Sequence, residues 1–194
     1  FTKLSGRPRT HLGAVDAVTG KPSPELDLPV GPPFRGANVD VKNLDVAPDG
    51  RTLVIIGNFA SVGGFDRPQV ALVDLSASPD AVIDWRAQAF ERSCVHTTPS
   101  YVRDVDFSPD GSYFVIVTTG DNRGGVCDAA SRWDTADRGP VEPRWLDTAG
   151  DTLLSVAVTE AAVYGGGHQR WHNLPNPLPR SGIAAPDPLS SVPP

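Results

Sequence analysis

The sequence repeats itself at intervals of about sixty residues, and this repeat limits the possible folds more than any other feature. The segment Val41-Lys-Asn-Leu-Asp-Val-Ala-Pro-Asp-Gly50 is matched 61 residues later by Val102-Arg-Asp-Val-Asp-Phe-Ser-Pro-Asp-Gly111. Each segment alternates apolar and polar residues and then reaches Pro-Asp-Gly. Alternation is typical of a half-buried strand, and Asp-Gly supplies the positive backbone angles of a tight hairpin. Each unit therefore opens with a β-hairpin.

A second match extends the repeat toward the start of the chain. Phe1-Thr-Lys-Leu-Ser-Gly-Arg7 corresponds to Phe59-Ala-Ser-Val-Gly-Gly-Phe65, and the match runs on without a gap to Asp16 and Asp74, at an offset of 58 throughout. Asp74 and Trp85 recur 60 residues later as Asp134 and Trp145, and Leu154-Ser-Val-Ala-Val158 opens another unit. Four strands per unit follow: an inner strand, a second strand after the hairpin, a third strand ending in Asp, and an outer strand near Trp85 or Trp145.

Units of four strands predict an all-β fold, a partial β-propeller with about three four-stranded antiparallel blades in one domain, residues 1–194. The predicted units are residues 1–40 (a partial blade), 41–100, 101–152 and 153–194 (a partial blade). The alternative is a β-sandwich, but sandwiches seldom keep register over three matches. A closed propeller typically has about four to eight blades. We therefore expect the missing blades to come from the rest of the precursor or from another chain.

Composition agrees with an all-β fold and excludes several classes of partner. The 19 glycines and 20 prolines lie between short apolar runs, and no run is long enough to cross a membrane. The net charge of −6 argues against a nucleic-acid partner. The chain has no Met and opens at Phe1 without a basic-then-apolar leader, which we interpret as a start inside a longer precursor or a cleaved product.

Four segments resemble the repeats of large secreted actinobacterial β-propeller proteins, over nearly the whole chain. They are Gly57-Asn-Phe-Ala-Ser-Val-Gly-Gly64, residues 101–111, Cys127-Asp-Ala-Ala-Ser-Arg-Trp133 and Val163-Tyr-Gly-Gly-Gly-His-Gln-Arg-Trp171. The resemblance implies a secreted or cell-surface protein, often with carbohydrate-binding or immunoglobulin-like modules beside it, and no specific reaction. The last residues depart from the pattern, because Pro186 occupies a strand position that is usually apolar. The strand there must be an edge or frayed.

The two cysteines are predicted to form a disulfide. In an up-and-down blade, the loop between blades and the loop between the second and third strands lie on the same face. Cys94 belongs to the first kind of loop and Cys127 to the second. A disulfide suits a secreted protein. The alternatives are two buried thiols or a catalytic or metal role, although no His lies at a metal-like spacing beside either Cys.

The same face carries the long loops 57–68, 86–100, 119–131 and 165–180, so we expect a ligand there. The candidate ligand-binding residues are His168, Arg170, Trp171, His172 and Arg123. The two histidines lie four residues apart in a loop, not on a helix, so we predict no metal site. Two interpretations of this stretch stay open: Trp171 packs between blades while the histidines bond to backbone, or Trp171 and Arg170 stack on a sugar or bind another ligand.

Other recurrent residues have structural explanations. The repeated position of Trp85 and Trp145 predicts core packing. Four aspartates that each precede a turn are expected to cap the turn backbone, namely Asp16, Asp74, Asp134 and Asp187. Asp104 and Asp106 alternate with apolar residues on an inner strand, where they line a central channel or bind calcium, although the spacing lacks a calcium-loop glycine.

No catalytic signature is present, since the sequence has no Gly-x-Ser-x-Gly elbow, no phosphate-binding glycine loop with Lys and no His-Glu-x-x-His. We assign no catalytic residue, metal or cofactor. The leading hypothesis is a non-enzymatic extracellular binding or scaffold protein that recognises a glycan or a cell-surface protein through the long-loop face. The alternative is a secreted propeller hydrolase or lyase acting on polysaccharide, with its site residues spread over several blades.

Overall fold

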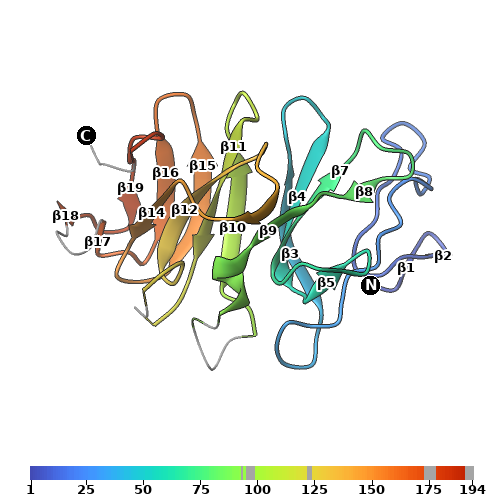
Figure 1. Ribbon diagram of the computed structural model, residues 1–194, viewed down its shortest axis with the longest axis horizontal. Helices are drawn as coiled ribbons and strands as arrows, with labels where there is room; N and C mark the ends of the chain where they lie inside the picture. Colours follow the sequence, from blue (N-terminus) through green and yellow to red (C-terminus); the bar gives the residue numbers. More distant parts are fainter. Residues whose placement is uncertain (93, 95–98, 122–123, 173–177, 191–194) are drawn as a thin grey trace.

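A computed structural model describes residues 1–92, 94, 99–121, 124–172 and 178–190. Its antiparallel sheets stand side by side in the order of the chain (Figure 1). The first sheet contains β3 (Asp40–Val46), β4 (Thr52–Asn58), β7 (Val70–Asp74) and β8 (Ala81–Val82). The second contains β10 (Val102–Phe107), β11 (Tyr113–Thr118), β12 (Ala129–Asp134) and β14 (Trp145–Thr148). The third contains β15 (Leu153–Val158), β16 (Val163–Gly167) and β19 (Ile183–Ala184).

The predicted all-β propeller class is confirmed. In each sheet the strands follow chain order, and each pairs with the next in antiparallel register, as in a propeller blade. The division of the chain at residues 40, 100 and 152 stays a prediction. The edge position expected near Pro186 is confirmed, because β19 has only two residues and lies at the edge of its sheet. No helix among the described residues is long and apolar enough to span a membrane.

Small two-stranded hairpins lie beside the larger sheets and extend the repeat seen in the sequence. They are β1 (Lys3–Leu4) with β2 (Arg7–Pro8), β5 (Ser61–Val62) with β6 (Phe65–Asp66), and β17 (Trp171–His172) with β18 (Leu178–Pro179). The first two lie 58 residues apart with the same register, which confirms that sequence match. Residues 12–16 do not form the expected third strand and keep only a bridge from Val15 to Pro22, since residues 1–11 offer no second strand for them to pair with.

The two Pro-Asp-Gly segments lie at hairpin tips, as predicted, but with a different turn. The carbonyls of Ala47 and Ser108 each accept the N–H of the glycine three residues on, at 2.8 Å. Gly50 and Gly111 have φ of +73° and +71°, whereas neither aspartate has a positive φ. The sequence prediction of positive angles at Asp was therefore wrong. Pro and Asp form the turn, and the glycine after them takes the left-handed position.

Each inner strand has an irregularity at the same place, between Val41 and Asn43, between Val102 and Asp104, and between Leu153 and Ser155. A glycine on the second strand lies opposite two of these bulges. A Cβ on Gly57 would lie 1.9 Å from the Asp40 carbonyl oxygen, and one on Gly167 would lie 2.4 Å from the Thr152 carbonyl oxygen. Both contacts are to backbone, which cannot move aside as a flexible side chain would.

We expect Gly57→Ala to lower the free energy of unfolding by roughly 1–3 kcal/mol, because the added methyl group forces the two strands apart at the bulge. Urea denaturation followed by circular dichroism measures the change. Gly165→Ala is the matched control, since its Cβ would meet only the Leu153 side chain at 3.6 Å. Equal losses in the two variants would contradict the backbone clash.

Apolar side chains fill the spaces between the sheets. Because successive residues of a strand face opposite ways, Val54 and Ile56 of β4 pack toward the second sheet, and Leu53 and Ile55 pack toward residues 1–40. A further cluster, including Val115 and Val117, joins the second sheet to the third. The second sheet is thus buried on both of its faces.

Trp85 and Trp145 both pack between sheets, which confirms the predicted role. Trp145 lies on the outer strand β14 as expected. The outer strand predicted near Trp85 is β8, which lies just before it, and Trp85 itself begins β9 (Trp85–Ala87), which pairs in parallel with β13 (Gly139–Val141) of the following unit. A single-turn 3₁₀ helix, η1 (Gln88–Glu91), follows β9 directly.

Three of the four recurrent aspartates cap turns as predicted. The Oδ1 atoms of Asp16, Asp74 and Asp187 accept backbone N–H groups two or three residues on, together with a Ser or Thr hydroxyl. The prediction was wrong for Asp134, whose Oδ2 accepts instead from Arg144 Nε at 2.6 Å.

Candidate functional site

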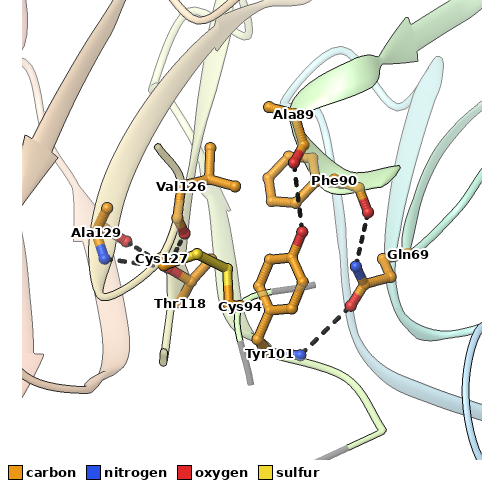
Figure 2. Close-up of a disulfide and its surroundings, with 9 residues drawn as sticks. All are labelled: Gln69, Ala89, Phe90, Cys94, Tyr101, Thr118, Val126, Cys127 and Ala129. Carbon is orange, nitrogen blue, oxygen red and sulfur yellow. Dashed lines mark hydrogen bonds between the residues drawn. A yellow bond between two sulfur atoms is a disulfide. The ribbon is translucent and has the colours of Figure 1, made fainter. Parts of the chain in front are cut away.

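A disulfide joins Cys94 and Cys127, with 5.3 Å between their Cα atoms, and confirms the predicted pairing (Figure 2). Cys94 follows η1 on the connection from the first sheet to the second, and Cys127 precedes β12. The bond therefore links the connection between two sheets to a loop within one of them. It supports the prediction that both loops lie on one face.

The η1 side of the disulfide is held by buried polar contacts (Figure 2). Gln69 is fully buried, and its side-chain amide donates to the Phe90 carbonyl at 2.8 Å. The same side chain accepts the Tyr101 N–H at 3.4 Å. The Tyr101 hydroxyl donates to the Ala89 carbonyl at 3.4 Å, and burial raises the pKa of Tyr101 far above its ordinary value, so the hydroxyl stays protonated as a donor.

The other side of the disulfide is held by Thr118 of β11. Its hydroxyl donates to the Val126 carbonyl at 2.5 Å and accepts the Ala129 N–H at 3.1 Å. Gly120 permits this fold of the loop, because a Cβ there would lie 2.7 Å from Cys127 Cβ. Loop 124–127 is thus attached to the second sheet, whereas η1 is attached through Gln69 to the first sheet and through Tyr101 to the start of the second.

A hollow of about 320 Å³ lies between these two walls. Its lining comprises Gln88, Ala89, Arg92, Cys94, Gly124, Gly125, Val126, Cys127 and Glu142. An amide, a guanidinium and a carboxylate therefore face the space, and the disulfide forms part of its wall. Such a lining offers a positively charged donor, a negatively charged acceptor and a neutral amide, which suits a small polar ligand.

Of the five predicted ligand-binding residues, four are described by the structure, and these four (His168, Arg170, Trp171 and His172) are not among the described residues that line this hollow. His168 and Arg170 are exposed beside the third sheet, and Arg170 Nε lies 3.7 Å from Asp151 Oδ2. Trp171 lies so close to Gly150 that a Cβ there would be 2.1 Å from the indole. Arg123 lies outside the described residues. A ligand-binding role for these residues stays a prediction.

His172 is buried, and its Nδ1 lies 2.5 Å from Oδ2 of the equally buried Asp147. Its Nε2 is buried, and no described residue forms a hydrogen bond with it. An imidazole oriented by a carboxylate is an arrangement that general bases use, but this pair is shielded from solvent. Over the residues that the structure describes, no group of three or more His, Cys, Asp or Glu side chains is placed to hold a metal ion.

Comparison with known proteins adds a likeness in structure. No protein-family model matches the chain, and no curated protein does. Among solved structures, the chain is similar to the β-propeller domain of Cps50 (Swd1) from Myceliophteria thermophila, with 13% identity and a TM-score of 0.39 over 90% of this chain. It spans 59% of that structure's length.

Sequence reasoning missed the residues that line and support the hollow, Gln69 above all. Gln69 has φ +67° immediately before β7. His11, Asp128 and Gly182 occupy the corresponding place before residues 12–16, β12 and β19, and each also has a positive φ. Of these four residues only Gly182 is a glycine, and it was the only signal in the sequence of this left-handed turn. Gln88, Arg92 and Glu142 lie outside the matched segments, so the repeat gave no signal for them.

Aspartates join the inner strands, a role for Asp104 and Asp106 that neither sequence hypothesis named. Asp104 Oδ2 accepts the Val156 N–H at 2.9 Å, and Asp106 Oδ2 accepts the Val158 N–H at 2.5 Å. Asp45 bonds to the Phe107 N–H in the same way, at 2.9 Å. These carboxylates link the inner strand of one sheet to the next, so they are committed to backbone, and calcium binding is not supported.

We expect the stability of the protein to respond to pH through Asp106. Burial raises the pKa of this carboxyl, and the nearby charges of Asp45 and Asp104 add to the effect, against the opposing bond from Val158. A raised folded-state pKa gives stability that is present below the unfolded value of about 3.8 and lost as the pH rises through the folded value. Asp106→Asn keeps an oxygen that accepts the Val158 N–H, and it removes the loss of stability at higher pH. Its melting temperature relative to wild type should rise as the pH increases above about 4.

Asp110→Asn is the control in the same melting-temperature measurements, because its effect should change with pH in the opposite direction. Hydrogen bonds from Ser108 and Ser112 lower the pKa of Asp110 to about 2, so its stabilisation is present above about 3.8 and lost as the pH falls toward 2. Asp110→Asn should therefore destabilise the protein more at neutral pH than in acid. If the two variants shift in the same direction, the assigned causes are wrong.

Proposed function

We propose that this protein is a non-enzymatic extracellular binding or scaffold protein that recognises a glycan in the hollow between η1 and loop 124–127. The hollow itself carries the proposal, because it is a concave polar space on the long-loop face, built on rigid sheets and linked across by a disulfide. The disulfide also supports an extracellular setting, where such bonds persist.

The lining favours a hydroxyl-rich ligand over an apolar one. Sugar hydroxyls both donate and accept, and Gln88, Arg92 and Glu142 supply an amide, a donor group and an acceptor group. Gly124 and Gly125 have φ of +75° and +60° and are exposed, so backbone groups are also accessible there. Among the described residues that line the hollow no aromatic ring is present, and we therefore expect recognition by hydrogen bonds rather than by stacking.

A glycan array probed with the oxidised protein tests the proposal, followed by calorimetry on each positive sugar. We expect Arg92→Ala and Glu142→Ala each to weaken binding by at least about tenfold, since a hydrogen bond to a charged group contributes about 1.5–3 kcal/mol. Arg51→Ala, next to the Asp49-Gly50 tip, is the control and should bind as wild type does. Absence of any glycan ligand, or turnover of a bound polysaccharide, overturns the proposal.

A further inference from the structure

The disulfide forms part of the wall of the hollow, although both of its cysteines are buried. Both cysteines belong to the lining, yet they differ in exposure: Cys127 is 7% exposed and Cys94 is 1% exposed. A space of about 320 Å³ holds a small organic molecule, given that a water molecule occupies about 30 Å³. A thiol of low molecular weight can therefore reach the sulfur atoms without unfolding the sheets around them.

We propose that the Cys94–Cys127 disulfide undergoes thiol–disulfide exchange with a low-molecular-weight thiol in the folded protein, and that reduction separates the two walls of the hollow. The site is a redox modification site, and its reactant class is a small thiol. This inference does not rest on glycan binding.

The exchange proceeds in two balanced steps. A small thiolate attacks Sγ of Cys127, the less buried of the two cysteines; the S–S bond breaks, and Cys94 leaves as a thiolate that takes a proton from water. A second small thiolate then attacks the small-molecule sulfur of the mixed disulfide, and Cys127 leaves as a thiolate that is protonated in turn. Two small thiols are oxidised to their disulfide, and the protein gains two thiols.

Reduction is expected to loosen the walls because each is held by its own hydrogen bonds. The η1 wall bonds to Gln69 before β7 and to Tyr101 directly before β10, and the wall of loop 124–127 bonds to Thr118 of β11. Among the described residues that line the hollow, the disulfide is the one covalent link between these walls. Once it breaks, each wall keeps its own anchor, and the hollow widens.

The decisive experiment measures the rate of reduction by 2-mercaptoethanol under native conditions, with alkylation by iodoacetamide and mass spectrometry to count free thiols. Access through the hollow predicts a rate that rises linearly with thiol concentration. It also predicts the same rate in wild type and in the less stable Gly57→Ala. If reduction requires global unfolding, the rate in Gly57→Ala rises at least about fivefold, and the proposal is overturned.

Two further measurements test whether the thiol reaches the disulfide through the hollow and what reduction does to the walls. A thiol attached to a polymer of several kilodaltons should react at least about tenfold more slowly than 2-mercaptoethanol, because it cannot enter the hollow. Hydrogen exchange on the reduced protein should increase in residues 124–127 and stay unchanged in β11. Equal rates for the two thiols, or a uniform increase in exchange over the second sheet, contradicts the proposal.

Discussion

Replacing Cys94 and Cys127 together by alanine is expected to lower the free energy of unfolding by about 3 to 4 kcal/mol. The bond spans 33 residues of sequence and so restricts the unfolded chain, and in the chain-entropy model a loop of that length accounts for this value. For a protein of this size the melting temperature should fall by about 6 to 16 °C. Reversible urea denaturation and calorimetry measure the two quantities.

The reduced wild-type protein is the natural control for this double variant. It retains both side chains and lacks only the bond, so it should unfold at nearly the same urea concentration as the variant. A loss below about 1 kcal/mol in both proteins would show that the loops are held in place without the bond.

The disulfide was predictable from the sequence because it follows from topology alone. Counting strands places the loop after the outer strand and the loop after the second strand on one face, whatever their side chains. The Pro-Asp-Gly tips and the hairpins 58 residues apart were predictable for a similar reason, since each depends on residues close in sequence. Local turn chemistry and regular alternation are what a single sequence reports best.

The path of Trp85 was not predictable, although its burial was. A recurrent Trp indicates a packed position, but the repeat cannot say which strand the backbone pairs with. Here β8 completes the first sheet, and β9 crosses to pair with β13. Tertiary packing decides which neighbouring strand the backbone pairs with, and the spacing of residues in the sequence carries no information about that packing.

The hollow and the buried pair of His172 and Asp147 were missed for the same physical reason. His172 meets a carboxylate 25 residues away, and the hollow is formed by η1, loop 124–127 and Glu142. Such contacts join segments from different sheets and leave no periodic pattern. The sequence could point to the long-loop face, but not to the residues on it that come together.

Trp85→Ala is expected to lower the free energy of unfolding by about 3 to 5 kcal/mol, the range for truncating a buried aromatic side chain. Trp85 is fully buried, and its ring lies 5.5 Å from those of both Phe114 and Trp133, edge-on to Trp133. Truncation leaves a cavity between the first and second sheets. Urea denaturation with circular dichroism measures the loss.

Phe65→Ala is the matched control, because the Phe65 ring is 54% exposed and should cost less than about 1 kcal/mol. The double variant Trp85→Ala/Trp133→Ala adds a second criterion. Since the two rings touch, removing both should cost less than the sum of the single losses, with a coupling of about 0.5–1.5 kcal/mol. Additive losses, or a cost for Trp85→Ala no larger than that of the control, would mean that the two sheets do not meet through this cluster.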